Sequence, residues 1–205
     1  ILDPYVNQII NRDEQNHIIA GLIELNKILE IGGLPEVKLI YSVTPPIVHK
    51  GSVTTEGDAI LKADQVRNLP NGPDGKGRKI GLISDGVDHY TKSISTGDLP
   101  TSFQILSNAQ GGDEGTAMSE IVYDISPGSD LAFADAGSNI IEMAQHMQDL
   151  ADAGCNVIVD DIIYSQEPVF EDGIIAKKAD SLYGKNHLMV SSAGNYALKS
   201  FYGAF

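Results

Sequence analysis

The sequence has one cysteine, no tryptophan and no long apolar run. With only Cys155, an internal disulfide and a metal site built from several cysteines are both excluded. The apolar residues around Cys155 predict a buried structural thiol. A membrane-spanning helix needs a run of about 18 apolar residues, and none occurs. The histidines also lack a zinc-ligand spacing such as His-x-x-x-His, which argues against a zinc site.

Basic residues are scarce as well. There are 14 against 28 acidic residues, which gives a net charge of −14. A surface that follows a phosphate backbone needs clustered Lys and Arg, so nucleic acid is excluded as a partner. The acidic excess fits a secreted, salt-tolerant or calcium-binding protein, but plain solubility explains it better. The missing initial methionine indicates a processed or trimmed product.

What is present is typical of one globular domain. The 205 residues suffice for a single sizeable core with a small appendage. Apolar residues make up 42% and charged residues 20%, which is too apolar for a disordered chain. The composition therefore predicts a folded soluble protein with one main domain.

Residues 1–50 differ in pattern from the rest. Apolar residues recur at roughly helical spacing over residues 3–30, which predicts a helix that Gly32-Gly33 ends. A short strand is expected at VKLIYSV, before the connector Pro45-Pro46. We therefore predict a small helix-strand appendage or propeptide remnant here, followed by a second unit over residues 51–205.

From residue 56 onward, strands and helices alternate. The stretch EGDAILKADQVRN predicts a helix, and a polar turn follows it. Compact apolar runs then predict strands at 79–84, 103–106, 130–134, 156–161 and 187–191, and apolar stripes predict helices at 115–125, 139–153 and 173–183. This alternation predicts an α/β fold with a mostly parallel sheet and helices on both faces.

In such sheets, chemistry collects beyond the carboxyl ends of the strands. Three segments lie there: Asp85 after KIGLIS, Asp160 and Asp161 after NVIV, and residues 191–195 after HLMV. Glu114 begins a predicted helix, where the helix dipole favours negative charge. These polar residues are therefore candidates for one common site.

Each motif alone also has a plain structural explanation. Asp85-Gly86 can be a simple turn, although a carboxylate at a buried strand end needs a partner. In SSAGN, the small residues Ser192 and Gly194 let the backbone approach a ligand, and the amide of Asn195 can donate to an oxyanion. Asn195 can equally be a loop residue in a left-handed conformation.

The three motifs occur together and in order: ISDGVD, then DEGTAMSEIVYDISPGSDL, then SSAGN. In this combination the sequence resembles the subtilisin-like serine peptidases over roughly residues 52–205. The family's motifs are Asp-Ser/Thr-Gly, His-Gly-Thr-x-x-Ala and Ala-Gly-Asn. The resemblance implies that Asp85 is the triad acid, that Glu114 occupies the position of the base, and that Asn195 is the oxyanion donor. It also implies peptide-bond hydrolysis and a secreted or extracytoplasmic protein.

Two departures from that family stand out. Glu114 replaces the histidine, and no Gly-Thr-Ser-x-Ala segment with the nucleophile occurs up to Phe205. In the family this segment lies many tens of residues after Ala-Gly-Asn. We therefore expect the serine in a C-terminal part of the same protein that this sequence does not include. The alternative is a catalytically inactive relative that serves as a binding or scaffold module.

A glutamate can replace the histidine. The related sedolisins share the fold and use glutamate with aspartate, four residues apart on one helix, and they work in acid. Here Met118 stands at that fourth position, so the expected partner of Glu114 is Asp85. Two carboxylates that share a proton can accept the serine proton at low pH. Asp113 competes with Glu114 for this role, and both can simply be acids at a helix start.

Asp160 and Asp161 stand where the family has residues that line the substrate crevice. One of the two should face the crevice, because side chains alternate along a strand. They can select a basic substrate residue, supply a third carboxylate coupled to Glu114, bind a metal, or be solvated strand-end acids. A peptide substrate is expected to add a strand near Asp161.

Other partners and cofactors are not indicated. His89 follows the Asp85 motif and is expected to be an exposed loop residue. Calcium is chemically permitted on residues 85–88 or on Glu171-Asp172, but nothing in the sequence calls for it. A nucleotide-binding fold is excluded because no glycine-rich phosphate loop occurs.

Overall fold

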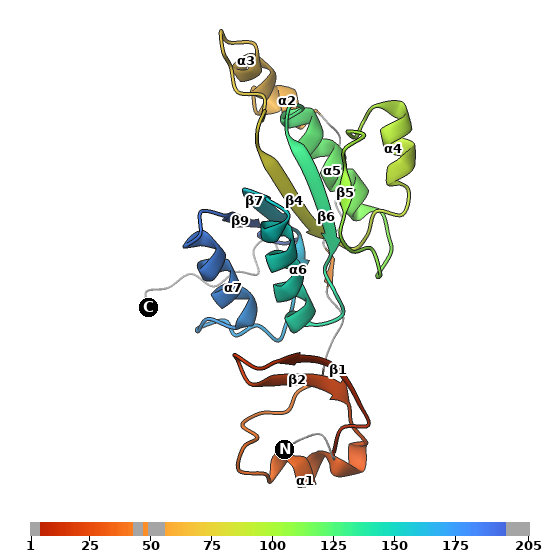
Figure 1. Ribbon diagram of the computed structural model, residues 1–205, viewed down its shortest axis with the longest axis vertical. Helices are drawn as coiled ribbons and strands as arrows, with labels where there is room; N and C mark the ends of the chain where they lie inside the picture. The colour runs from red at the N-terminus through yellow and green to blue at the C-terminus, as the bar shows by residue number, and fades with distance from the viewer. Residues whose placement is uncertain (1–4, 43–46, 49–55, 196–205) are drawn as a thin grey trace.

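The computed structural model describes residues 5–42, 47–48 and 56–195. Its centre is a five-stranded, all-parallel sheet in the order β5-β6-β4-β7-β9 (Figure 1). The strands are β4 (Lys79–Ser84), β5 (Gln104–Ile105), β6 (Asp130–Asp135), β7 (Val157–Asp160) and β9 (Leu188–Ser191). The structure is therefore the predicted α/β fold with a parallel sheet.

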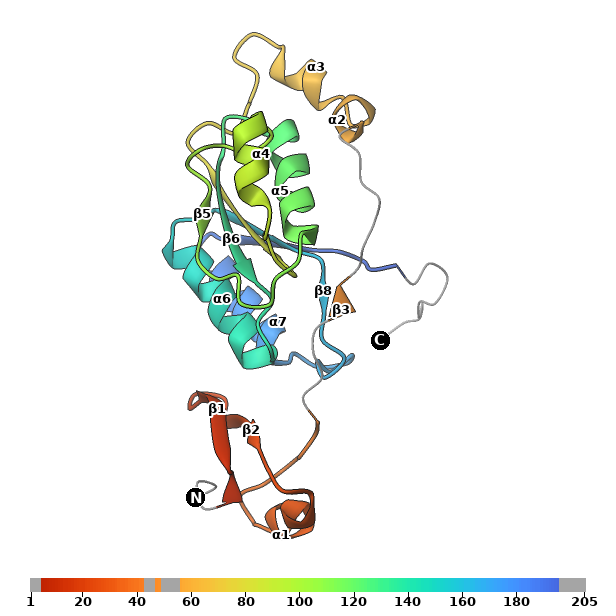
Figure 2. The ribbon, with the colours of Figure 1, turned by 90° about the vertical axis from the view of Figure 1, so that its right-hand side faces the viewer.

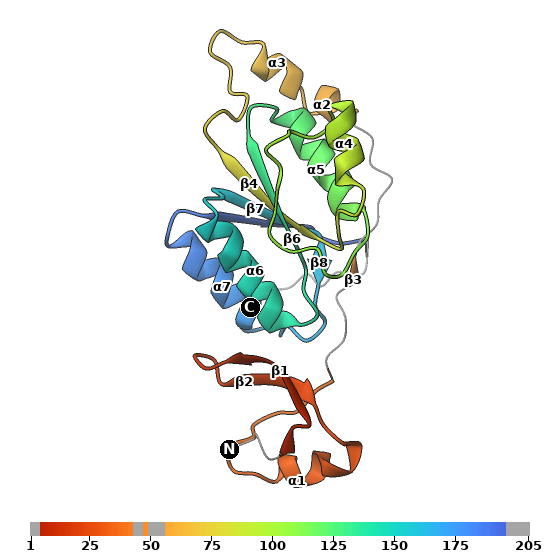
Figure 3. The same cartoon turned by 45° about the vertical axis from the view of Figure 1, so that its right-hand side comes forward.

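Helices cover both faces of this sheet. On one face lie α4 (Tyr90–Thr96) and α5 (Glu114–Ile125), and on the other α6 (Ile140–Asp152) and α7 (Ile174–Tyr183) (Figures 2 and 3). Alternation along the strands supplies a core to each face. Leu82 and Phe133 pack with α4 and α5, whereas Ile83 and Ala134 pack with α6 and α7.

The connection through α5 has an unusual hand. The chain moves outward from β4 through α4 to the edge strand β5, and then back through α5 to β6. Both helices lie on the same face, so the two connections have opposite hands. The connections through α6 and α7 move in the same direction as that through α5 but on the other face. Because about 98% of such connections are right-handed, the one through α5 is the left-handed exception.

The N-terminal region corrects the helix predicted for residues 3–30. It forms an antiparallel hairpin of β1 (Gln8–Asp13) and β2 (Ile18–Leu22), followed by the 3₁₀-helix η2 (Leu25–Lys27) and α1 (Ile28–Gly32) (Figure 1). Exposure alternates residue by residue along β1, which is the strand period. The β-branched isoleucines of both strands fit a pleated surface, and Asn16 N–H donates to Asp13 Oδ1 at 2.9 Å in the turn.

The described residues between the hairpin and the sheet form only short regular elements. The strand expected at residues 37–43 is not formed over the described residues 37–42. The helix expected at 56–68 is two short helices, α2 (Gly57–Ile60) and α3 (Ala63–Arg67). They are separated at Lys62, whose φ is +59°. A two-residue strand, β3 (Ile47–Val48), pairs antiparallel with β8 (Ile162–Ile163).

Cys155 is fully buried, as predicted, and burial raises the pKa of its thiol to about 11. Within the described ranges, no helix has the length and apolar character needed to cross a membrane.

Candidate functional site

The carboxyl ends of the parallel strands meet at one edge of the sheet. β4, β6, β7 and β9 end in polar residues, namely Ser84, Asp135, Asp160 and Ser191. Three of these side chains, all except Ser191, are buried. Buried polar groups need hydrogen-bond partners. A carboxylate at this edge whose oxygens are fully bonded stabilises the fold, whereas one without partners is available for chemistry.

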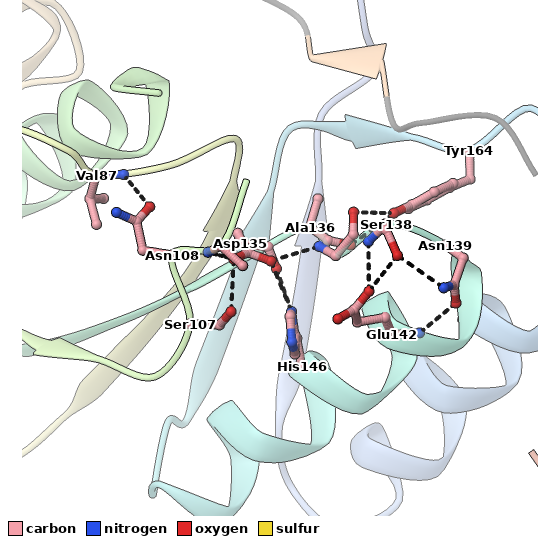
Figure 4. Close-up of polar contacts among 12 residues, drawn as sticks. Val87, Ser107, Asn108, Asp135, Ala136, Ser138, Asn139, Glu142, His146 and Tyr164 are labelled. Carbon is pink, nitrogen blue, oxygen red and sulfur yellow. Dashed lines mark hydrogen bonds and ion pairs between the residues drawn. The ribbon is translucent and has the colours of Figure 1, made fainter. Parts of the chain in front are cut away.

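Asp135 at the end of β6 is a structural carboxylate. It is fully buried and accepts hydrogen bonds from Ser107 Oγ at 2.7 Å, Ala109 N at 2.5 Å and Gly137 N at 2.9 Å. His146 Nδ1 lies 2.6 Å from the Asp135 carbonyl oxygen, as Figure 4 shows. The donors to the Asp135 carboxylate come from the segments that precede and follow β6 in the chain. Asp135 thus fixes the loops around the strand end and has no free oxygen for a ligand.

Asp85, the first predicted site residue, directly follows β4. Its Oδ1 accepts hydrogen bonds from Gly86 N at 2.6 Å and from Gly115 N at 3.2 Å. Gly115 is the second residue of α5, so this contact joins the first motif to the helix that Glu114 begins. Gly112 has a φ of +122°, and a Cβ there would collide with the Asp85 carboxylate. The predicted proximity of Asp85 and the start of α5 is present.

The loops that carry these two residues are held together by backbone and side-chain bonds. Asp88 N donates to Gly112 O at 2.8 Å, and Gly112 N donates to Asp88 Oδ2 at 3.0 Å. Asn108 donates to Asp88 Oδ1 at 3.0 Å and accepts from Val87 N at 2.9 Å. The start of α5 is therefore fixed beside the end of β4.

His89 and Asp113 form an exposed pair at the same place. His89 Nδ1 lies 2.5 Å from Asp113 Oδ2, and His89 N donates to Asp113 Oδ1 at 2.8 Å. The side-chain hydrogen bond raises the pKa of His89. Burial acts to raise the pKa of Asp113, but the bonds from His89 outweigh it and lower that pKa. His89 is exposed, as expected, yet Asp113 fixes its orientation.

Asp160 is buried and has partners. Its Oδ1 accepts from Ser191 Oγ at 2.9 Å and from Ile162 N at 3.2 Å, and its carbonyl oxygen accepts from Ser192 N at 3.0 Å. Burial raises the pKa of Asp160, while the bonds from Ile162 and Ser191 lower it. Asp160 thus ties β7 to the end of β9.

Asp161 is buried without such partners. Its exposed fraction is 8%, and both carboxylate oxygens lack solvent access and a hydrogen bond among the described residues. The same is true of the Ser84 hydroxyl. Burial raises the pKa of Asp161 to about 6, and the charge of Glu114 also acts to raise it. The Ser84 hydroxyl lies close enough to lower this pKa, although it does not meet the geometry of a hydrogen bond. Asp161 is therefore a carboxyl whose charged form burial disfavours.

The third motif follows β9 at the same edge of the sheet. Ser192 and Asn195 are exposed, and Gly194 has a φ of +73°. No hydrogen bond joins Asn195 to Asp85, Glu114 or Asp161 in the part of the chain that the structure describes. The strand topology thus brings Asn195 to the predicted edge, and its oxyanion role stays a prediction.

The edge of β8, directly after Asp161, accepts an added strand. Ile47 pairs with Ile163 and Val48 pairs with Ile162, in antiparallel register. Figure 2 shows β3 lying beside β8. One edge of β8 next to Asp161 is therefore occupied by β3, and the addition of a peptide strand near Asp161 stays a prediction.

Two comparisons with known proteins bear on this site. No protein-family model matches the chain. No curated protein matches its sequence either. The resemblance to subtilisin-like peptidases therefore stays a prediction that rests on the three motifs.

The described residues contain no group of three or more His, Cys, Asp or Glu side chains placed to hold a metal. Asp85 and Asp88, two of the carboxylates considered for calcium, accept hydrogen bonds from neighbouring loops. These bonds give both side chains a role in holding the loops.

Sequence reasoning missed two features of the site. One is the Ser84 hydroxyl, which lies beside Asp161. Ser84 could have been recognised from its place as the last residue of the strand that runs into Asp85. The pairing of His89 with Asp113 carried no sequence signal, since 24 positions separate the two residues.

Proposed function

We propose that residues 51–205 form part of a serine peptidase of the subtilisin-like type, in which a carboxylate serves as the base. The observation that carries this proposal is the hydrogen bond from Gly115 N to Asp85 Oδ1. It puts the acid of the first motif at the start of the helix that Glu114 begins.

In this proposal Glu114 is the general base and Asp85 holds the helix start in place. The nucleophilic serine belongs to a C-terminal part of the protein. As its Oγ bonds to the scissile carbonyl carbon, its proton passes to the Glu114 carboxylate and the carbonyl π electrons move to the oxygen. Glu114 then protonates the leaving nitrogen as the C–N bond breaks, which leaves an acyl-enzyme for water to hydrolyse.

The substrate side of the proposal rests on β8 and β9. A peptide would pair in extended form with the edge of β8 opposite to β3. The small residues Ser192 and Gly194 leave room for its backbone, and the Asn195 amide would donate to the oxyanion. The resemblance also implies an extracytoplasmic location.

The test is labelling by a fluorophosphonate, which reacts with activated serines, in protein that carries the downstream sequence. Labelling measured from about pH 3 to 8 should follow the ionisation of a carboxylate and disappear in Glu114→Gln. Glu120→Gln is the matched control, because it makes the same charge change further along α5 and should keep the labelling. Unchanged labelling in Glu114→Gln refutes the glutamate base, and no labelling at any pH refutes the peptidase and favours a binding module.

A further inference from the structure

We propose that the N-terminal region binds an extended peptide that is apolar in its middle and has a lysine or arginine beside the apolar run. The binding place is a cavity of about 470 Å³ between β2 and residues 36–41, here called the hairpin slot. Its lining contains neither Asp85 nor Glu114 nor Asp161. The inference therefore goes beyond the proposed function and does not depend on it.

The hairpin slot follows the edge of β2 that β1 leaves free. Consecutive residues of β2, from Ile18 to Gly21, all line it, and no residue of β1 does. Successive side chains of a strand point to opposite faces, so a cavity that meets all of them must run along the edge of the strand. The hairpin lies between α1 and α6 in Figures 1 and 3. The slot accordingly has Ile31 of α1 as well as Ile140 and Ile141 of α6 in its lining.

The other border of the hairpin slot is the segment of residues 36–41, all of which line the cavity. This segment forms no strand. Within the described ranges, the backbone of residues 38–41 has no hydrogen bond to another backbone group. Asn139 Nδ2 donates to Asn11 Oδ1 at 2.7 Å, and Gln166 Nε2 donates to Ser42 O at 3.3 Å. These two bonds attach both borders of the slot to the α/β unit.

The backbone along the slot favours a peptide over other apolar ligands. β2 is the outer strand of a two-stranded sheet, so about half of its N–H and C=O groups point away from β1. Such an edge pairs readily with an added strand, whereas an apolar small molecule offers no matching row of donors and acceptors. Because the slot is apolar towards both α1 and α6, successive residues of the peptide should be apolar, as in strands that are buried on both faces.

Charge at one end of the slot selects the residue next to the apolar run. A second cavity of about 250 Å³ adjoins the slot and shares Ile18 and Tyr41 with it. The charged residues that line this second cavity are one cation, Lys177, and three acids, Glu167, Glu171 and Asp172. The excess of negative charge is complementary to a lysine or arginine side chain. The expected ligand is therefore an apolar strand with a basic end.

The slot can be tested with the peptide acetyl-Lys-Thr-Val-Val-Val-Thr-Lys-amide, whose two lysines allow either strand direction. When it binds to this 205-residue chain, hydrogen exchange should slow at the amides of residues 38–41 and of β2, and should stay unchanged in α5. A control peptide with N-methyl groups on the three valines keeps the side chains but loses their donors, so it should bind about tenfold more weakly or worse. Replacing both lysines by glutamates should also weaken binding.

Two exposed leucines provide matched variants of the protein. Leu39 lines the slot at 74% exposure, whereas Leu29 is 90% exposed and does not line it. Leu39→Asp should weaken peptide binding about tenfold, and Leu29→Asp should leave it unchanged. Neither change touches a buried core residue, so loss of folding does not explain a difference between them.

Three results would overturn the proposal. Binding that N-methylation does not weaken assigns the slot to an apolar small molecule. A dimer in sedimentation that Leu39→Asp dissociates and Leu29→Asp does not shows that a second copy of this chain occupies the edge of β2. Absence of binding at about 1 mM peptide, far weaker than specific recognition requires, shows that the slot takes no such strand.

Discussion

Replacing Asp161 by asparagine should change how stability depends on pH. The pKa of this buried carboxyl is raised by burial from 3.8 to about 6, so the folded state binds its proton more tightly than the unfolded state. Stability therefore falls as pH rises through the window between these two values, and the loss is complete above about pH 6. A difference of about two pH units corresponds to about 3 kcal/mol. The asparagine does not titrate and lacks this loss.

The assay is denaturant unfolding of the wild type and Asp161→Asn at intervals from about pH 4 to 8. The free energy of unfolding of the variant, relative to wild type, should rise by about 3 kcal/mol across this range. Asp180→Asn, on the exposed side of α7, controls for the removal of one negative charge and should show no such rise. If the free energy of unfolding has the same pH dependence in wild type and Asp161→Asn, the raised pKa of Asp161 is refuted.

Three further outcomes are expected. Gly112→Ala should destabilise the protein by about 1–3 kcal/mol in denaturant unfolding, because the new Cβ collides with Asp85 at a positive φ. Asp135→Ala should cost about 3 kcal/mol or more by the same assay, since it leaves three donors without an acceptor. Asp113→Asn should lower the pKa of His89 in an NMR titration. The pair of His89 and Asp113 stabilises the fold below the ordinary histidine pKa, and this stabilisation is lost as pH rises through the raised pKa of His89.

The sheet and its long helices were predictable because their apolar pattern is strong. The strand KIGLIS was expected at 79–84 and is β4, and α5, α6 and α7 begin within one residue of their expected starts. In contrast, α4 was missed because YTKSIST has few good helix formers, and only Tyr90 and Ile94 pack on the core. The helix over residues 3–30 was wrong because isoleucines can satisfy a helical spacing by chance while their β-branched side chains favour a hairpin.

The left-handed connection through α5 could not be predicted, since pattern reasoning assumes the common right-handed hand. Its consequence is nonetheless local. Returning from the edge on the α4 face, the chain starts α5 next to the end of β4, where Gly115 N–H meets Asp85. The exceptional topology is what brings the first two motifs together.

The candidate site was predictable in its members but not in its charge states. Strand ends and motif order selected Asp85, Glu114 and Asp161 from the sequence. Asp160 accepts a hydrogen bond from Ser191, which lies on another strand. Asp161 has no such partner among the described residues. The expected pairing of the Asp85 and Glu114 carboxylates stays a prediction, because the hydrogen bond at this place runs from Gly115 N to Asp85 Oδ1. The sequence alone does not show which of the buried acids Asp135, Asp160 and Asp161 lacks hydrogen-bond donors.

The unpartnered carboxyl makes the stability of the fold depend on pH. Burying Asp161 without donors costs more free energy when the carboxyl is ionised than when it is protonated, so the fold tolerates it best in acid. A residue that does not titrate at this position would remove the added cost of ionisation. The proton that Asp161 keeps below about pH 6 therefore stabilises the fold on the acid side of neutrality.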